Sequence, residues 1–164
     1  MIPCRGGPGG ANHPTGWWDP APVPLIELVD ETFVVADPEV VARAVHDRGR
    51  WGQWWPGLTV TPFMDRGAKG IRWSASGERW TGSIELWLEP LRDGVLMHHY
   101  QRLDPVDGTT LSPRQVAREH ARRAKHWKRH AFAFKDALES GRRPGTGVHP
   151  DGSRSRPDLP RMGG

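Results

Sequence analysis

The sequence predicts a single α+β domain in which an antiparallel sheet curves around one long C-terminal helix. Two observations carry this prediction. Four strand-like runs between residues 58 and 102 are joined by connections too short for parallel crossovers. They are followed by an apolar stripe with helical spacing over residues 112–140. A strongly twisted antiparallel sheet can wrap around such a helix, and incomplete packing between the two leaves a cavity.

The folding unit is shorter than the chain of 164 residues. Glycine and proline gather at the two ends, where no periodic apolar pattern is present. Such segments bury too little apolar surface to offset the entropy lost on ordering. We therefore expect a disordered leader at 1–24, one folded domain at 25–140 and a disordered basic tail at 141–164.

The first element is a strand, because residues 25–36 (LIELVDETFVVA) are rich in β-branched and apolar side chains. A helix over about 38–47 follows. Asp37 is a suitable N-cap, and Pro38 occupies the first helical position, where its missing N–H is not needed. The segment RWGQWWPG at 50–57 then predicts a short irregular or helical turn.

Four further strands are expected at about 58–65, 69–76, 79–89 and 94–102, separated by turn-forming residues. In the third of these runs, apolar and polar side chains alternate, which is typical of a strand with one buried and one wet face. Its apolar phase is formed by Trp80, Ile84, Leu86 and Leu88.

The last element is a helix of about 27 residues, near 40 Å long. Ser112 is its N-cap, Pro113 takes the first position and Gln115 completes a capping box. One buried face is predicted by residues that recur at steps of three and four: Val116, His120, Ala124, Trp127, Ala131, Phe134 and Leu138.

Charge is distributed unevenly along the chain. The formal net charge of +4 combines −4 for residues 25–111 with +5 for residues 112–140 and +3 for the tail. Cys4 is the only cysteine, so an internal disulfide is excluded. The sequence has no apolar run near 18 residues and no apolar N-terminal stretch of the signal-peptide kind, so we expect a cytoplasmic protein without a membrane span.

Five pieces of sequence, in order, carry a resemblance to a known family: residues 34–41 at the strand-to-helix junction, Trp51 with residues 54–57, residues 84–90, residues 94–104 and residues 127–138. They resemble the START-like, or SRPBCC, superfamily, and are most similar to its bacterial polyketide cyclase/dehydrase-type and lipid-transfer members. The resemblance implies a helix-grip fold with two short helices after the first strand. It also implies a pocket for a lipid-like, aromatic or polyketide-like ligand. The family usually has more than the five strands expected here.

Eight residues are candidates for lining such a pocket: Trp54, Trp73, Trp80, His98, His99, Tyr100, His120 and Trp127. Tryptophan suits apolar walls that also contact a polar group. Because side chains alternate along a strand, only one of His98 and His99 faces inward. His99 shares its phase with Val95 and Met97, and His98 shares its phase with Leu96 and Tyr100, so both phases are half apolar and the choice stays open.

The sequence predicts no metal and no cofactor. His126 and His130 are four residues apart, with Glu119 on the same flank, but the motif is HWKRH rather than HExxH. Arg123 and Arg129 crowd that flank, which we interpret as a solvated helix face.

Three functions are compatible with these observations. The first is binding of an apolar or aromatic small molecule between the sheet and the C-terminal helix. The second is a cyclase/dehydrase-type enzyme that uses a pocket histidine or tyrosine for proton transfer. The third, which the lack of a recognisable nucleic-acid-binding motif disfavours, is binding of nucleic acid or anionic lipid by the basic helix face.

Overall fold

The computed structural model describes residues 23–139, and the expected leader and basic tail lie outside the described residues. A five-stranded antiparallel sheet has the order β1-β5-β4-β3-β2. Its strands are β1 (Ile26–Val34), β2 (Thr59–Asp65), β3 (Gly70–Ser76), β4 (Trp80–Leu91) and β5 (Gly94–Pro105). The predicted sheet is therefore confirmed, and its fourth and fifth strands extend two or three residues beyond their predicted C-terminal ends.

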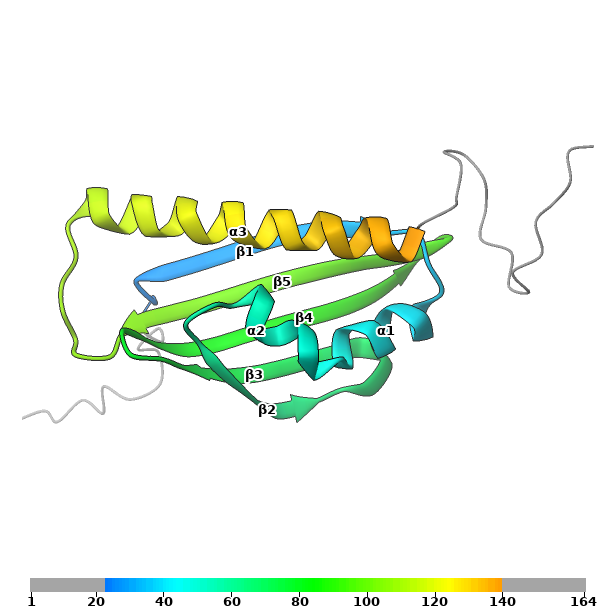
Figure 1. Cartoon of the computed structure of the whole chain (residues 1–164), viewed down its shortest axis with the longest axis horizontal. Coiled ribbons are helices and arrows are strands. Elements are labelled where there is room, and N and C mark those ends of the chain that lie inside the picture. The colour runs from blue at the N-terminus through cyan, green and yellow to red at the C-terminus, as the bar shows by residue number, and fades with distance from the viewer. Residues whose placement is uncertain (1–22, 140–164) are drawn as a thin grey trace, which may run out of the picture.

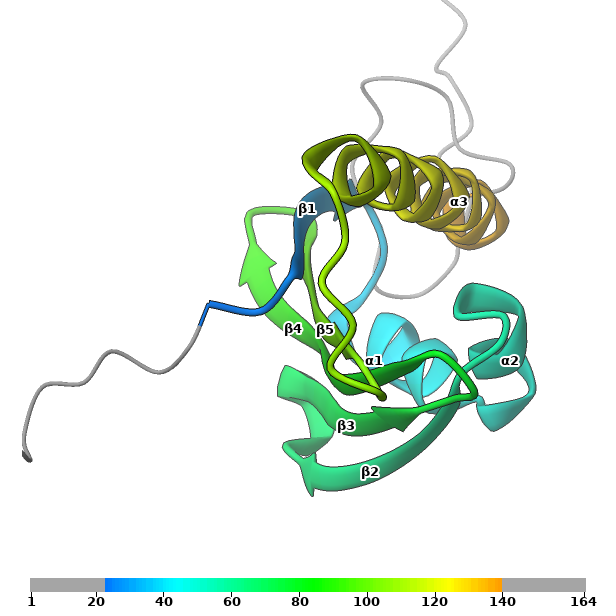
Figure 2. The same cartoon turned by 90° about the vertical axis from the view of Figure 1, so that its left-hand side faces the viewer.

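The helices are α1 (Pro38–His46), α2 (Arg48–Trp54) and α3 (Pro113–Glu139), with a short 3-10 turn η1 (Gly67–Lys69) before β3. All three lie on one face of the sheet, which curves around them (Figure 1, Figure 2). The long helix α3 runs along β1 at one side of the sheet, and α1 and α2 cover the remaining strands. This arrangement is the predicted helix-grip fold.

The junction between β1 and α1 follows the predicted capping chemistry. Asp37 is the N-cap of α1, and its Oδ1 accepts a hydrogen bond from the backbone N–H of Glu39 at 2.8 Å. Asp47 ends α1 and also begins α2, where its Oδ1 accepts from the N–H of Gly49 at 3.0 Å. The segment predicted as an irregular or helical turn is therefore a true short helix, capped by the residue that closes the preceding one.

Substituting Asp37 with alanine is expected to lower the free energy of unfolding by about 1 kcal/mol, because one N–H of the first turn loses its acceptor. Urea unfolding followed by circular dichroism measures the change. Asp37→Asn is the matched control, since its side-chain carbonyl still accepts the bond and it should lose much less. Equal losses in the two variants would show that the cap does not account for the effect.

The core lies between the sheet and the helices. The buried side chains of β5 are those with odd numbers, from Val95 to Leu103, and those of β4 have even numbers, from Trp80 to Leu88. From α3, the buried residues are Arg123, Trp127, Ala131 and Phe134. Among the described residues, no helix is long and apolar enough to cross a membrane.

Candidate ligand-binding site

An aromatic cluster fills the space between α2, α3 and the sheet. We define it as Trp54, Trp55, Trp73, His99 and Trp127. The rings of His99 and Trp127 stack with centroids 3.8 Å apart, and Trp55 lies parallel to Trp127 at 6.3 Å. Trp54 meets Trp127 edge to face at 6.0 Å, and Trp55 meets Trp73 at 5.0 Å. The cluster therefore joins α3 to the sheet through rings contributed by α2 and the residue that follows it.

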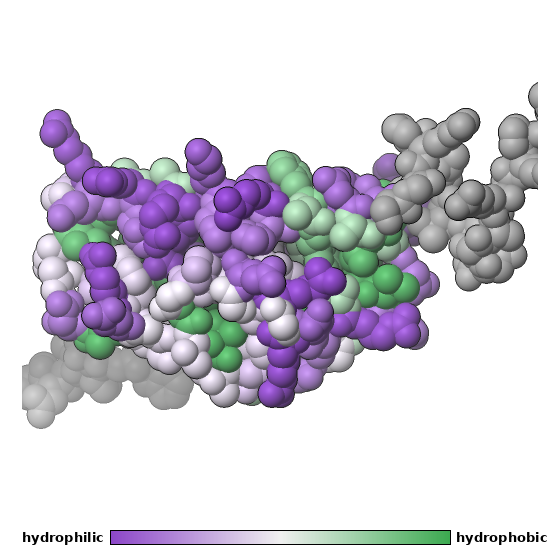
Figure 3. Space-filling model, viewed as in Figure 1, coloured by the Kyte–Doolittle hydropathy of each residue, from purple (hydrophilic) through white to green (hydrophobic). Residues whose placement is uncertain are grey.

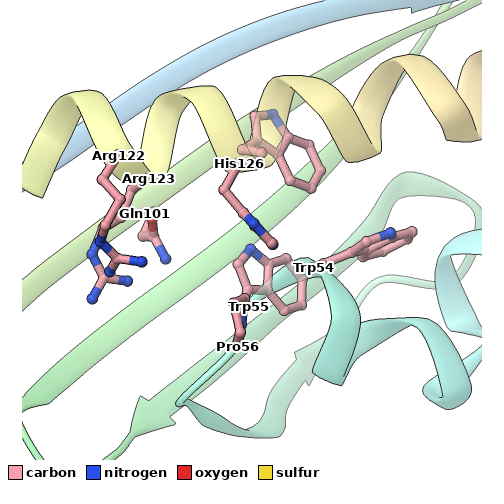
Figure 4. Close-up of a pocket in the computed structure, with 8 residues that line it drawn as sticks. Trp54, Trp55, Pro56, Gln101, Arg122, Arg123 and His126 are labelled. Atoms are coloured by element: carbon pink, nitrogen blue, oxygen red, sulfur yellow. The ribbon is translucent and has the colours of Figure 1, made fainter.

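A pocket lies at the outer edge of this cluster, between α2, β5 and α3 (Figure 4). It is lined by Trp54, Trp55, Pro56, Gln101, Arg122, Arg123, His126 and Trp127. The free volume is about 10 Å³, which is the space of about one water molecule. The sequence predicted a cavity at this place without giving its size. The free space is small because large indole rings from three elements occupy the volume that a ligand needs.

His99 is fully buried within the cluster and is neutral. The indole N–H of Trp55 donates to Nε2 of His99 at 3.3 Å, so the imidazole proton resides on Nδ1. Burial lowers the pKa of His99 to about 3, because the charged form loses its hydration. The Nδ1–H group is buried and has no acceptor within the described part of the chain.

Trp73 presents a second buried donor of the same kind. Its side chain is completely inaccessible, and its indole N–H has no partner among residues 23–139. Leaving a buried donor unpaired costs about 1–3 kcal/mol, so such groups are rare in folded proteins. Trp55 contacts the rings of both Trp73 and His99, so the two rings that carry unpaired donors adjoin the same indole.

Trp127 is held in position by a partly buried acid, Asp30. Its indole N–H donates to Oδ2 of Asp30 at 3.0 Å, and Nζ of Lys128 lies 2.5 Å from the other oxygen. Asp30 is the direct cross-strand neighbour of His99 in the register of β1 and β5. These contacts fix the Trp127 ring above His99 and tie the middle of α3 to the first strand.

His126 joins α3 to α2 at the rim of the pocket. Its Nε2 donates to the backbone carbonyl of Gln53 at 2.9 Å, and its Nδ1 accepts from a guanidinium nitrogen of Arg129 at 3.3 Å. This assignment satisfies both ring nitrogens of a neutral imidazole. The His126–Gln53 bond spans the entrance between the two helices.

The opposite end of the pocket is basic. Glu119 accepts from Nε of Arg123 at 2.7 Å and from Arg122 at 2.6 Å and 2.9 Å. Hydrogen bonding from Arg122 lowers the pKa of Glu119, whereas burial lowers the pKa of Arg123. Arg123 is 8% exposed and stacks over Trp80, with its guanidinium carbon 5.1 Å from the ring centroid.

A wider groove, with about 440 Å³ of free volume, lies between α1 and η1 and opens to solvent. It is lined by Glu39, Ala42, Arg43, His46, Asp47, Gly67 and Ala68. The two ring nitrogens of His46 are already bonded, to the carbonyl of Ala42 at 2.7 Å and to Asp65 at 3.0 Å. Within the described residues, the lining of this groove includes no tryptophan and neither of the unpaired buried donors, so the pocket beside the aromatic cluster is the better candidate site.

The predicted site residues differ in how close they lie to the pocket. Trp54 and Trp127 line the pocket, and Trp73 and His99 lie beneath it in the cluster. Trp80 contacts the pocket only through Arg123. His120 is half-buried on α3 and does not line the pocket.

His98 and Tyr100 lie on the opposite face of the sheet, which corrects their predicted placement in the cavity. They alternate with His99 along β5, so their rings point away from the helices and stack on each other at 6.4 Å. The two ring nitrogens of His98 contact Glu31 at 3.0 Å and Glu89 at 3.1 Å. His98 therefore links three neighbouring strands on the outer face.

Sequence reasoning missed six pocket residues: Trp55, Pro56, Gln101, Arg122, Arg123 and His126. A signal was present for two of them. Gln101 follows His99 by two residues on the same strand, so it faces the same way. Arg123 precedes Trp127 by four residues, so it shares that face of the helix.

The outer face of α3 is hydrophilic over much of its length (Figure 3). Its exposed cations are Arg114, Arg118, Arg122, Lys125 and Arg129. They follow one side of the helix at steps of three and four residues, as expected for a solvated surface, and Arg122 among them also reaches the edge of the pocket.

Several solved structures share this fold. The chain aligns with the Aha1 dimer protein of Colwellia psychrerythraea at 15% identity and a TM-score of 0.51, over 72% of this chain and 99% of that one. It aligns with the Polyketide_cyc-like protein Cgl2372 of Corynebacterium glutamicum at 14% identity and a TM-score of 0.52, over 73% and 94% of the two chains. No protein-family model and no curated protein sequence matches.

These likenesses confirm the fold that the sequence resemblance implied. The chain shares the fold of these two proteins, a helix-grip arrangement that here has a five-stranded sheet. At such low identity the comparison concerns the backbone arrangement, so the function has to be argued from the residues of the pocket itself.

Proposed function

We propose that this protein binds a small aromatic molecule between the sheet and α3, at the aromatic cluster. The observation that carries the proposal is the pair of buried N–H donors on His99 and Trp73, which have no acceptor in the described chain and belong to two rings that contact Trp55. A ligand carbonyl or hydroxyl oxygen that reaches either donor removes the cost of leaving it unpaired. The surrounding indole rings supply flat apolar walls for a planar ring system.

Binding requires an aromatic side chain to change position, because the free volume is about 10 Å³. Trp55 is the ring best placed to move. It follows the last residue of α2, and it precedes Pro56 and Gly57, where the backbone turns with a positive φ of 77°. If the Trp55 indole swings outward, it gives up its hydrogen bond to Nε2 of His99 and leaves space beside the rings of Trp73, His99 and Trp127.

Proton-transfer catalysis is less well supported than binding. A base that works at neutral pH needs a pKa near that pH, but burial holds the pKa of His99 at about 3. Tyr100, the other predicted proton donor, lies on the opposite face of the sheet. We therefore propose a binding protein, and the cyclase/dehydrase-type activity remains the alternative.

The test uses N-phenylnaphthylamine, a neutral aromatic dye that fluoresces in apolar surroundings. We expect the protein to bind it, with energy transfer from tryptophan. Trp55→Ala should bind it about tenfold more tightly, because an enlarged pocket that buries roughly 55 Å² more of the dye gains about 1.4 kcal/mol. Trp55→Leu gives a smaller enlargement if the alanine variant does not fold.

Trp87→Ala is the matched control, since Trp87 lies on the outer face of β4 and is 44% exposed. It should leave dye affinity unchanged. The near-ultraviolet circular dichroism spectrum establishes that each variant keeps its packed core. The proposal is overturned if folded wild-type protein and both Trp55 variants fail to bind the dye, or if Trp87→Ala changes the affinity as much as Trp55→Ala does.

A further inference from the structure

We infer that the aromatic ligand of this pocket carries an acidic group, which Arg123 binds through the free end of its guanidinium group. This inference rests on the proposed function, because it concerns the same pocket. It specifies the ligand class further, as an aromatic carboxylate, sulfonate or phosphate rather than a neutral aromatic or an acyl chain.

The first argument is charge. Two arginines, Arg122 and Arg123, line one end of the pocket, and both bond to the same carboxylate, Glu119. One positive charge is therefore left without a counter-charge in a partly buried place. Arg79 is close enough to Arg123 to repel it and to disfavour its charged form further. Buried cations are normally paired, so an anion bound here completes the arrangement.

The second argument is the geometry of Arg123. Its side chain is 7% exposed, and its flat guanidinium rests on the ring of Trp80. Only Nε is bonded, to Glu119, and neither terminal nitrogen has an acceptor within the described residues. A guanidinium that is already oriented by a stack and an ion pair presents its remaining N–H groups as a rigid fork, the shape that matches an acidic group with two oxygens.

The third argument is the continuity of polar groups from the rim to the aromatic cluster. Gln101 lies beside the guanidinium groups of Arg122 and Arg123, which point from α3 toward β5 (Figure 4). Gln101 is 3% exposed, and it lies two residues from His99 on the same face of β5. Two residues of a strand span about 7 Å. A ligand whose ring contacts His99 and Trp127 therefore has its acidic end within reach of Gln101 and Arg123.

The experiment compares two dyes with the same aromatic skeleton. Anilinonaphthalene sulfonate carries an acidic group, and N-phenylnaphthylamine does not. We expect wild-type protein to bind the sulfonate more tightly than the neutral dye. Arg123→Gln should weaken binding of the sulfonate about tenfold or more, as for loss of a charged hydrogen bond, and change binding of the neutral dye less than about twofold.

Arg118→Gln is the matched control, because it removes the same charge from an exposed position on the same helix. It should affect neither dye. Arg123→Lys keeps the charge but loses the fork, so an intermediate loss is expected, and this variant also serves if Arg123→Gln does not fold. Denaturation curves establish that the compared variants are folded.

The outcomes separate the two proposals. If neither dye binds to wild-type protein, the proposed binding function itself fails. If the neutral dye binds but Arg123→Gln and Arg123→Lys leave the affinity for the sulfonate unchanged, only the acidic-group inference is overturned. It is also overturned if Arg118→Gln weakens sulfonate binding as much as Arg123→Gln does, because the effect is then general electrostatic attraction to α3.

Discussion

Replacement of Trp127 with alanine is expected to lower the free energy of unfolding by about 4 kcal/mol. The variant loses the stack on His99 at 3.8 Å and the edge-to-face contact with Trp54 at 6.0 Å. It also removes the indole donor to Asp30, which then keeps only its contacts with Lys128 and Thr32. Urea unfolding monitored by circular dichroism at neutral pH measures the loss.

Phe132→Ala is the matched control for this prediction. Phe132 lies on the same helix, is 51% exposed and contacts Lys128 at its ring face. Truncation of this exposed ring should cost less than about 1 kcal/mol. If the two variants lose similar amounts of stability, Trp127 does not anchor α3 in the way that its contacts indicate.

Hydrogen exchange locates the effect of Trp127→Ala. Few residues of α3 are buried, and none of its first ten residues is among them. Loss of the central anchor should therefore speed amide exchange along α3 more than in β4 and β5, which pair with each other along their full lengths. Uniform acceleration across the domain would instead indicate that α3 and the sheet unfold as one unit.

The elements of this fold were predictable because their signals are local. The Asp37-Pro38 pair marks the start of a helix wherever it occurs before an apolar periodic run, and the structure shows the corresponding cap. The hairpins of β3, β4 and β5 follow from short turn-forming connections. The pairing of β1 with β5 joins residues about 70 apart, and no local signal in the sequence predicts it.

The orientation of the adjacent histidines shows what local alternation leaves undecided. Alternation places His98 and His99 on opposite faces but does not say which face is inside. On β5 the two phases contain similar numbers of apolar residues, and the outer phase includes Leu96 and Tyr100. Packing of the helices determines which of the two histidines is buried, because Trp127 of α3 stacks on His99.

The size of the cavity could not be predicted from the sequence, although its location was. A tryptophan on a cavity wall and a tryptophan that fills the cavity have the same spacing along the chain. The difference depends on the angle at which Trp55 leaves the end of α2, and on the proximity of that helix to α3. For the same reason Arg123, which any helical wheel places beside Trp127, was assigned to the solvated face although it is 8% exposed.

The buried imidazole of His99 is expected to lower the free energy of unfolding at acidic pH. Burial lowers its pKa from 6.5 to about 3 in the folded state. Between these two values the unfolded chain binds a proton that the folded chain does not bind, so the free energy of unfolding falls as the pH falls. At 1.36 kcal/mol per pH unit, the contribution of His99 decreases by about 2 kcal/mol between pH 7 and pH 5.

Comparing wild type with a His99→Gln variant at two pH values separates the contribution of His99 from those of other titrating groups. His99→Gln keeps an acceptor for the Trp55 N–H and a donor in place of Nδ1–H, but it does not titrate. The free energy of unfolding of each protein is measured by urea denaturation at pH 7 and at pH 5. Wild type should lose about 2 kcal/mol more than His99→Gln over this interval. Equal losses would show that His99 is protonated in the folded protein at pH 5. The neutral imidazole, and with it the hydrogen bond that Nε2 of His99 accepts from Trp55, would then be wrong.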